Sequence, residues 1–358
     1  MADSLEGRSD LVCDCRKRLA SGFELDVQLS IPLENAAVTV LFGPSGSGKT
    51  TLLRLLAGLE KPDRGSIVFR GRPWQNLPPQ ARRAGFLFQE YALFPHLTVA
   101  ENVAYAAPRH TALGLMEAFG LTEFAGRLPR AISGGQQQRT ALARALAAGP
   151  ELLLLDEPLS ALDAPTRTRM RYELRRLLHA GGVPSIVVTH DRMEAVALGD
   201  WMAVMVDGRI RQVGPVREVF RRPADRQVAE SVGVENVLPA EIAGRDGGLL
   251  TLKVADARLQ CVDSGETGPV FACIHAEDVA ITREPEHLPT LSTARNRLAG
   301  RVRSVTVEGA LARIELDCGF PLVAVVTSQS AADLALREGE AVSAVVKATA
   351  VHLAAYSP

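Results

Sequence analysis

The first two thirds of the chain alternate short apolar runs with amphipathic stretches. Apolar runs of strand length lie at residues 38–42, 85–88, 152–155, 185–189 and 202–206. This alternation predicts an α/β domain in which helices cover a parallel sheet. Residues 91–147 are mostly helical in pattern, so we expect a helical subdomain there, ending in a helix over 133–147. An Asp-Gly turn at 207–208 and a helix over 215–222 complete a domain spanning residues 1–235.

After residue 237 the pattern changes to short alternating strands. Gly-Gly, Asp-Ser-Gly and Glu-Gly sequences interrupt them, and helix is expected only around 330–336. We therefore predict a small all-β, OB-like region over 236–358. It contains two tandem segments, 237–283 and 296–354, joined by a Pro- and Thr-rich linker over 284–295. An internal repeat is too faint to establish from one sequence.

The amino-acid composition disfavours several kinds of protein function. The 358 residues include 40 basic and 41 acidic side chains, which disfavours a nucleic-acid binder that depends on electrostatics. No apolar run approaches the roughly 18–20 residues needed to span a bilayer, and residues 1–10 lack the apolar core of a secretory signal. We therefore expect a cytoplasmic location. The five cysteines show no C-x-x-C spacing, so free thiols are expected.

The strongest motif is a glycine-rich loop directly after the predicted strand 38–42. It fits G-x-x-x-x-G-K-[ST] and leads into a helix, as a phosphate-binding P-loop does. Glycines let several backbone N–H groups face an anion, Lys49 adds a mobile positive charge, and the Thr50 hydroxyl is an expected Mg²⁺ ligand. The nucleotide-binding residues predicted here are Gly43, Pro44, Ser45, Gly46, Ser47, Gly48, Lys49, Thr50 and Thr51.

A pair of carboxylates follows the apolar run 152–155. Asp156 and Glu157 would stand at the C-terminal end of a buried strand, where α/β sheets bind their ligands. We expect Asp156 to orient Mg²⁺ through water and Glu157 to act as general base on the attacking water. An Asp-Glu pair by itself also occurs as a helix cap, so it indicates a catalytic site only in combination with the other motifs.

The run over 132–139, Ile-Ser-Gly-Gly-Gln-Gln-Gln-Arg, resembles the signature motif of ATP-binding cassette (ABC) proteins. A Ser N-cap and two glycines open a helix there, which makes a second anion site without a lysine. The resemblance implies that this segment binds the γ-phosphate of a nucleotide held by another subunit, and hence a homodimer with two sandwiched ATP molecules. The residues carried over are Ser133, Gly134, Gly135 and Gln136.

Three further positions match the same family in order. Gln89 resembles the Q-loop glutamine, which contacts Mg²⁺ or the attacking water. Asp163 ends a segment similar to the D-loop at the dimer interface, and His190 resembles the switch histidine at the γ-phosphate. The resemblance thus implies Glu157, His190 and Gln89 as catalytic residues. The family's adenine-stacking aromatic has one candidate here, Phe23, which lies slightly close to the P-loop and could instead face the core.

Residues 93–99 and the β-rich tail are similar to those of importer ATPases. No membrane span is fused to the chain, so the resemblance implies a peripheral protein on the cytoplasmic face of the cell (inner) membrane. Its partners would be integral-membrane permease subunits and, indirectly, a solute-binding protein. We expect a docking surface that includes Phe94 and His96.

Residues 291–356 resemble the Mop domain, of Mop/TOBE type, found on molybdate importer ATPases. The resemblance implies molybdate or tungstate as solute, with oxyanion contacts from Arg295, Ser328 and Lys347. Three alternatives stay open: an importer for sulfate or another solute, a soluble ABC ATPase without a transport role, and a tail that only stores or senses oxyanion. The second alternative predicts a paired cassette or a long coiled coil, and neither pattern is present.

Overall fold

The computed structural model describes residues 10–33, 37–160, 162–283 and 292–356. Internal contacts divide the chain into two units, Met1–Val219 and Phe220–Pro358. The sequence placed the division near residue 235. The difference arises because helix α9 (Arg226–Ser231) contacts strands of the second unit. The N-terminal segment up to residue 9 and residues 284–291 of the predicted linker lie outside the described residues.

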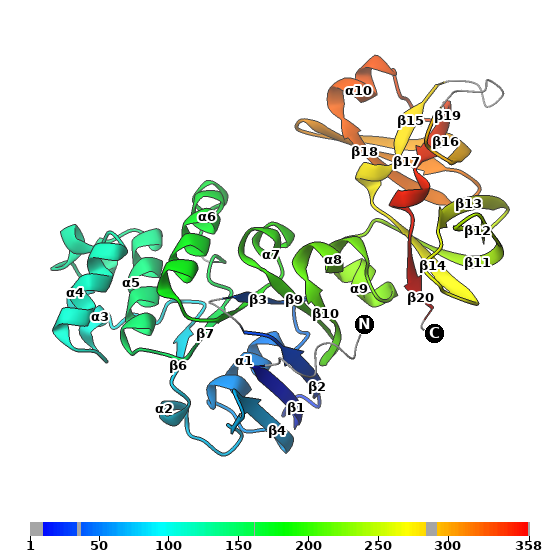
Figure 1. Cartoon of the computed structure of the whole chain (residues 1–358). Coiled ribbons are helices and arrows are strands. Elements are labelled where there is room, and N and C mark those ends of the chain that lie inside the picture. Colours follow the sequence, from blue (N-terminus) through cyan, green and yellow to red (C-terminus); the bar gives the residue numbers. More distant parts are fainter. Residues whose placement is uncertain (1–9, 34–36, 161, 284–291, 357–358) are drawn as a thin grey trace. The chain divides into compact units, whose positions relative to one another are not determined.

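A six-stranded sheet forms the centre of the first unit (Figure 1). Its order is β10-β9-β3-β8-β7-β6, and every pair is parallel except the β9/β10 hairpin at Asp207–Gly208. The strands are β3 (Val38–Phe42), β6 (Ala84–Leu87), β7 (Leu152–Asp156), β8 (Ser185–Thr189), β9 (Trp201–Val206) and β10 (Arg209–Pro215). The sequence predicted β3 and β8 with these bounds and the other three parallel strands to within one residue.

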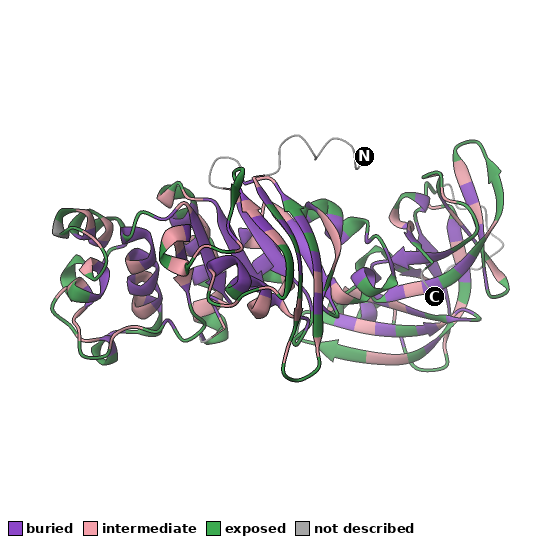
Figure 2. Ribbon diagram, turned by 90° about the horizontal axis from the view of Figure 1, so that it is seen from below, coloured by how far each residue is buried: buried purple, intermediate pink, exposed green. Residues whose placement is uncertain are grey.

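Both faces of this sheet are covered, as Figure 2 shows by the buried colour along its strands. In β7, Leu152 and Leu154 pack into one hydrophobic cluster, whereas Leu153 and Leu155 pack into another on the opposite face. This explains why the strand is a continuous apolar run. The covering helices are α1 (Lys49–Ala57), α5 (Gly134–Ala147), α6 (Ala164–Gly181) and α7 (Arg192–Leu198), and α8 (Val216–Arg221) follows β10.

Three α-helices lie within residues 91–147. Helices α3 (Val99–Ala104) and α4 (Arg109–Ala118) pack with α5, and together they share one core cluster with the sheet. The short helix α2 (Pro79–Arg82) positions Arg82, whose guanidinium donates to the carbonyls of Leu55 and Leu56 at 2.5 and 2.9 Å. Arg82 therefore caps the C-terminus of α1, the helix that follows the P-loop.

A second, antiparallel sheet in this unit was not predicted. Its order is β2-β1-β4-β5, with β1 (Leu11–Arg18), β2 (Glu24–Ile31), β4 (Arg64–Phe69) and β5 (Arg72–Pro73). Strand β1 alternates buried and exposed positions, and three of its four exposed side chains, Asp14, Arg16 and Arg18, are charged. Such a half-polar strand lacks the continuous apolar run that marks the parallel strands.

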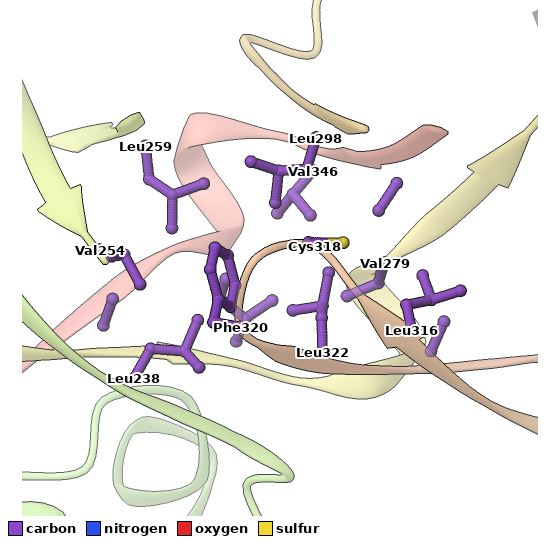
Figure 3. Packing of buried hydrophobic residues seen from close by; sticks show 14 of the residues in the cluster. Leu238, Val254, Leu259, Val279, Leu298, Leu316, Cys318, Phe320, Leu322 and Val346 are labelled. Carbon is purple, nitrogen blue, oxygen red and sulfur yellow. The ribbon is translucent and has the colours of Figure 1, made fainter. Parts of the chain in front are cut away.

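The second unit consists of two five-stranded sheets, β13-β12-β11-β14-β20 and β15-β19-β16-β17-β18, around one core (Figure 3). The predicted tandem segments exchange their last strands, since β20 pairs with β14 and β15 pairs with β19. The expected helix near 330–336 is α10 (Ser328–Asp333). The strands are β11 (Asn236–Asp246), β12 (Leu249–Val254), β13 (Ala257–Val262), β14 (Pro269–Ile274), β15 (Ala280–Thr282), β16 (Asn296–Glu308), β17 (Leu311–Asp317), β18 (Pro321–Thr327), β19 (Ala341–Val346) and β20 (His352–Ala355).

The two segments form an internal repeat that the sequence could not establish. Each begins with a buried asparagine whose side chain bonds a backbone in the other segment. Asn236 accepts from the Val323 N–H and donates to its carbonyl, at 2.6 and 2.9 Å. Asn296 bonds the two backbone groups of Gln260 in the same way, at 2.6 and 2.9 Å. These paired bonds tie each segment to its partner.

No helix among the described residues is long and apolar enough to cross a membrane.

Candidate ATP site

The P-loop connects β3 to α1 in a backbone conformation that requires glycine. Gly46 and Gly48 have φ of 81° and 99°, which side chains other than glycine rarely adopt. A Cβ on Gly43 would lie 2.0 Å from the carbonyl oxygen of Met205 on the neighbouring strand β9. The sheet and the loop therefore fix each other's position.

Lys49 is the first residue of α1, and its ammonium is turned back onto the loop. Its Nζ donates to the carbonyls of Gly43 and Pro44 at 2.8 and 2.7 Å. Burial lowers the pKa of Lys49, and the carboxylates of Glu157 and Asp156 oppose that shift. The ammonium also donates to the Ser47 hydroxyl at 3.4 Å, so all three of these acceptors are neutral. A buried cation with neutral acceptors is well suited to exchange these contacts for an anion.

A cavity of about 420 Å³ lies beside the loop, large enough for a nucleotide's phosphates and base to contact the chain. Phe23, Leu19 and Ser21 supply one wall of it. The sequence indicates Phe23 as a candidate for this wall but gives no sign of Leu19 and Ser21. These residues belong to the turn between β1 and β2, so their position depends on strand pairing that no local motif records. The P-loop side is lined by Ser45, Gly46, Gly48, Lys49, Thr50 and Thr51, together with Glu157.

Two oxygen-bearing side chains that could hold a cation, those of Thr50 and Asp156, lie together at the end of β7. The Thr50 hydroxyl donates to Asp156 Oδ1 at 3.0 Å, and Asp156 is 6% exposed. Burial raises the pKa of Asp156, and the bond from Thr50 opposes this effect. A bound cation would offset the cost of burying this carboxylate. A hydroxyl and one carboxylate suit Mg²⁺, which takes its remaining ligands from phosphates and water.

Glu157 and His190 come together because β7 and β8 are parallel neighbours whose carboxyl ends meet. His190 Nδ1 lies 3.1 Å from Glu157 Oε1. Glu157 has a φ of 44°, a strained conformation for a residue with a side chain. Gln89 is exposed just beyond β6, the strand on the other side of β7.

The signature residues stand apart from these groups. Ser133 caps α5, and its side chain and that of Gln136 form a reciprocal capping box. Ser133 and Gly134 are exposed, whereas Gly135 is buried against Met170. Asp163, also exposed, caps α6 through the Thr166 N–H. None of these residues lines the cavity beside the P-loop, so one chain does not bring the two halves of the predicted site together.

The three oxyanion candidates do not form one cluster within a chain. Asn296 pairs with Val346, so Arg295 and Lys347 adjoin the same end of the β16/β19 pair, and both are exposed. Ser328 follows β18 and donates its N–H to Ala310, at the opposite end of β16.

Comparisons with known proteins agree with this architecture. Residues 27–160 match the family model for the ABC transporter, and residues 292–353 match the TOBE domain. The predicted fold class, a P-loop ABC domain followed by a small all-β domain, is thereby confirmed. Among solved structures, a dimeric post-hydrolysis state of the ATP-binding cassette MJ0796 bound to ADP and Pi is 31% identical. It covers 58% of this chain and 98% of its own, with a TM-score of 0.50.

Curated relatives extend the match over nearly the whole chain. The molybdate/tungstate import ATP-binding protein of Pyrococcus horikoshii is 39% identical across 91% of this chain and 94% of its own length. A sulfate/thiosulfate import ATP-binding protein of Chromobacterium violaceum is 44% identical across 88% and 86%. A spermidine/putrescine import ATP-binding protein of Ruegeria pomeroyi is 43% identical across 66% and 70%. The chain therefore belongs to the ABC family, as an importer ATPase subunit that couples ATP hydrolysis to transport.

Proposed function

We propose that this chain energises the import of molybdate or tungstate, as a homodimer bound to integral-membrane permease subunits on the cytoplasmic face of the cell (inner) membrane. A separate solute-binding protein would deliver the oxyanion. The near-zero net charge supports this assignment over one with a nucleic-acid partner. The near full-length similarity to a molybdate/tungstate import protein is the observation that carries the proposal.

ATP binds with its phosphates in the P-loop. Lys49 exchanges its bonds to Gly43 and Pro44 for phosphate oxygens, since a charged acceptor binds the ammonium more strongly than carbonyls do. Thr50 and Asp156, with Gln89 nearby in the fold, would hold Mg²⁺. Bound Mg²⁺ supplies charge neutralisation at the phosphates. Phe23, on the wall of the same cavity, stacks on the adenine.

Glu157 is the general base. Its carboxylate accepts a proton from the attacking water, and the His190 ring at 3.1 Å holds the carboxylate in place and contacts the γ-phosphate. The strained backbone at Glu157 keeps the side chain at the end of β7, where the phosphates are bound.

The second half of each ATP site comes from the other subunit. Ser133 and Gly134 are exposed at the start of α5, away from the chain's own P-loop cavity, as a segment that serves a partner's nucleotide must be. Gln136 and the buried Gly135 lie in the same first turn of α5, and the exposed Asp163 caps the start of α6. The dimeric state named for the similar ATP-binding cassette supports this arrangement.

An aromatic patch on the helical subdomain is the proposed permease contact. The Phe94 ring lies 4.4 Å from that of Tyr105 and 6.3 Å from that of His96, between ring centroids. Arg144 of α5 lies over Phe94 at 5.1 Å. Tyr105 is 64% exposed, and such an exposed aromatic group is typical of a protein contact. The sequence indicated Phe94 and His96 but not Tyr105 or Arg144, which the fold brings to them.

Arg295 and Lys347 support an oxyanion site in the tail, because two cations at one strand end suit a dianion. Ser328 would then come from a second copy of the chain. Sulfate is the second candidate solute, favoured by the 44% identity to a sulfate/thiosulfate import protein.

Calorimetric titration of the purified full chain with molybdate, tungstate and sulfate tests the solute. We expect micromolar binding of molybdate and tungstate, no heat with sulfate, and loss of binding in Lys347→Ala. Lys253→Ala is the matched control, since Lys253 is an exposed lysine on β12. Tighter binding of sulfate would favour the second candidate, and no heat with any oxyanion would remove the tail from solute recognition.

A further inference from the structure

The loop that carries His190 is held by side chains to which the motifs assign no role. His190 follows β8 directly, and its side chain is 55% exposed. Packing therefore does little to fix the ring. Its position depends on the backbone at the residues on either side, Thr189 and Asp191.

The Thr189 hydroxyl bridges both sides of His190. It donates to Glu194 Oε2 at 2.7 Å and accepts from the Asp191 N–H at 3.0 Å. Thr189 is 2% exposed and Glu194 is 4% exposed, so water does not compete with these bonds. A hydroxyl has a single hydrogen, and here it is committed to Glu194.

Glu194 lies in the first turn of α7, which begins directly after the loop. Asp191 caps that helix, with Oδ1 accepting from the N–H groups of Met193 and Glu194 at 2.7 and 3.1 Å. Its Oδ2 accepts from Arg171 of α6 at 2.8 Å. Hydrogen bonds among residues 189, 191 and 194 therefore connect the backbone before His190 with the backbone after it. The bond from Arg171 connects this network to helix α6.

A cavity of about 110 Å³ adjoins this network and the catalytic carboxylate. Glu157, His190, Thr189 and Glu194 line it, together with Arg167. Burial raises the pKa of Glu194. The bond from Thr189 and the charges of Arg171 and Arg167 oppose that shift, whereas Asp191 adds to it. The Glu194 carboxyl group is thus enclosed, and Thr189 is its hydrogen-bond partner next to His190.

We propose that Glu194 and Thr189 are positioning residues for ATP hydrolysis, which fix the backbone on both sides of His190 and so hold its ring at Glu157. The inference rests on the role proposed above for His190. A displacement of 1 Å at a reacting group costs up to about 100-fold in rate, so loosening this loop should cost about tenfold.

Replacement of the hydroxyl tests the proposal in the full chain. Thr189→Val keeps the side-chain shape but removes the hydroxyl, and we expect kcat for ATP to fall about tenfold with KM unchanged. Thr189→Ser, which retains the hydroxyl, should restore kcat to within about twofold. Glu194→Gln keeps an acceptor for Thr189 and should be far more active than Glu194→Leu. Thr39→Val is the control, because Thr39 is a buried threonine on β3 whose hydroxyl has no hydrogen-bond partner among the described residues. Its kcat should not change.

A double-mutant cycle separates positioning from general damage to the fold. In a His190→Ala background, Thr189→Val should cost less than about twofold in single-turnover hydrolysis, because there is no ring left to position. Equal losses in both backgrounds would overturn the inference, as would an unchanged kcat in Thr189→Val. If His190→Ala itself leaves the rate unchanged, the proposed role of His190 fails and the inference fails with it. If His190→Ala slows ATP hydrolysis but Thr189→Val does not, the inference is refuted while the proposed role of His190 stands.

Discussion

Asn236 offers the sharpest test of how the two halves of the tail are joined. The side chain is 2% exposed and makes three hydrogen bonds: it donates to Ile274 at 3.1 Å and Val323 at 2.9 Å, and accepts from the Val323 N–H at 2.6 Å. Val323 belongs to the second tandem segment, whereas Asn236 begins the first. Asn236→Ala removes all three bonds and leaves backbone groups of β18 without these partners.

The expected loss of stability follows from those three hydrogen bonds. Each intramolecular hydrogen bond contributes about 0.5–1.5 kcal/mol net, so three of them give about 2–4 kcal/mol. For a unit of this size, 1 kcal/mol shifts the melting temperature by about 3–4 °C. We therefore expect the thermal transition of residues 220–358 to fall by about 10 °C. Asn296→Ala removes two such bonds to Gln260 and should cost less.

Differential scanning calorimetry with parallel tryptophan fluorescence provides the assay. The chain's two tryptophans, Trp74 and Trp201, both lie in the first unit, so fluorescence reports that unit alone. The fluorescence transition and kcat for ATP should stay unchanged while the other calorimetric transition moves down. A shift below about 2 °C in Asn236→Ala, or an equal shift in the fluorescence transition, would refute this account of the tail.

Three further predictions concern the ATP site and the permease contact. Glu157→Gln should bind ATP but hydrolyse it about 10²–10⁴-fold more slowly, and it should accumulate as an ATP-bound dimer in size-exclusion chromatography. Lys49→Ala should lose nucleotide binding. Normal turnover by either variant would contradict the assignment of the ATP site. Phe23→Ala should raise KM for ATP about tenfold with little change in kcat, since stacking contributes about 1–3 kcal/mol per base, and an unchanged KM would place the adenine elsewhere. Phe94→Asp should leave basal ATPase intact and abolish ATP-driven uptake in vesicles containing the permease; persistent uptake would exclude Phe94 from the contact.

The sequence alone determined the parts of this protein that depend on contiguous residues. The P-loop was identifiable because one short run must supply glycines, a lysine and a threonine in fixed order. Strand β7 was identifiable because burial on both faces demands a continuous apolar run. The capping box at Ser133 and Gln136 is similarly local, since its partners are three residues apart.

Only the tertiary structure decided which distant residues meet. The sheet order places β7 beside β8 and so brings Glu157 to His190, and the hairpin of β1 and β2 places Phe23 on the wall of the nucleotide cavity. The half-polar strand β1 escaped prediction, because its alternation becomes meaningful only against the sheet that buries one of its faces. The exchange of strands in the tail is likewise invisible in sequence, since the pairings of β20 with β14 and of β15 with β19 join segments tens of residues apart, and long-range pairing leaves no local pattern.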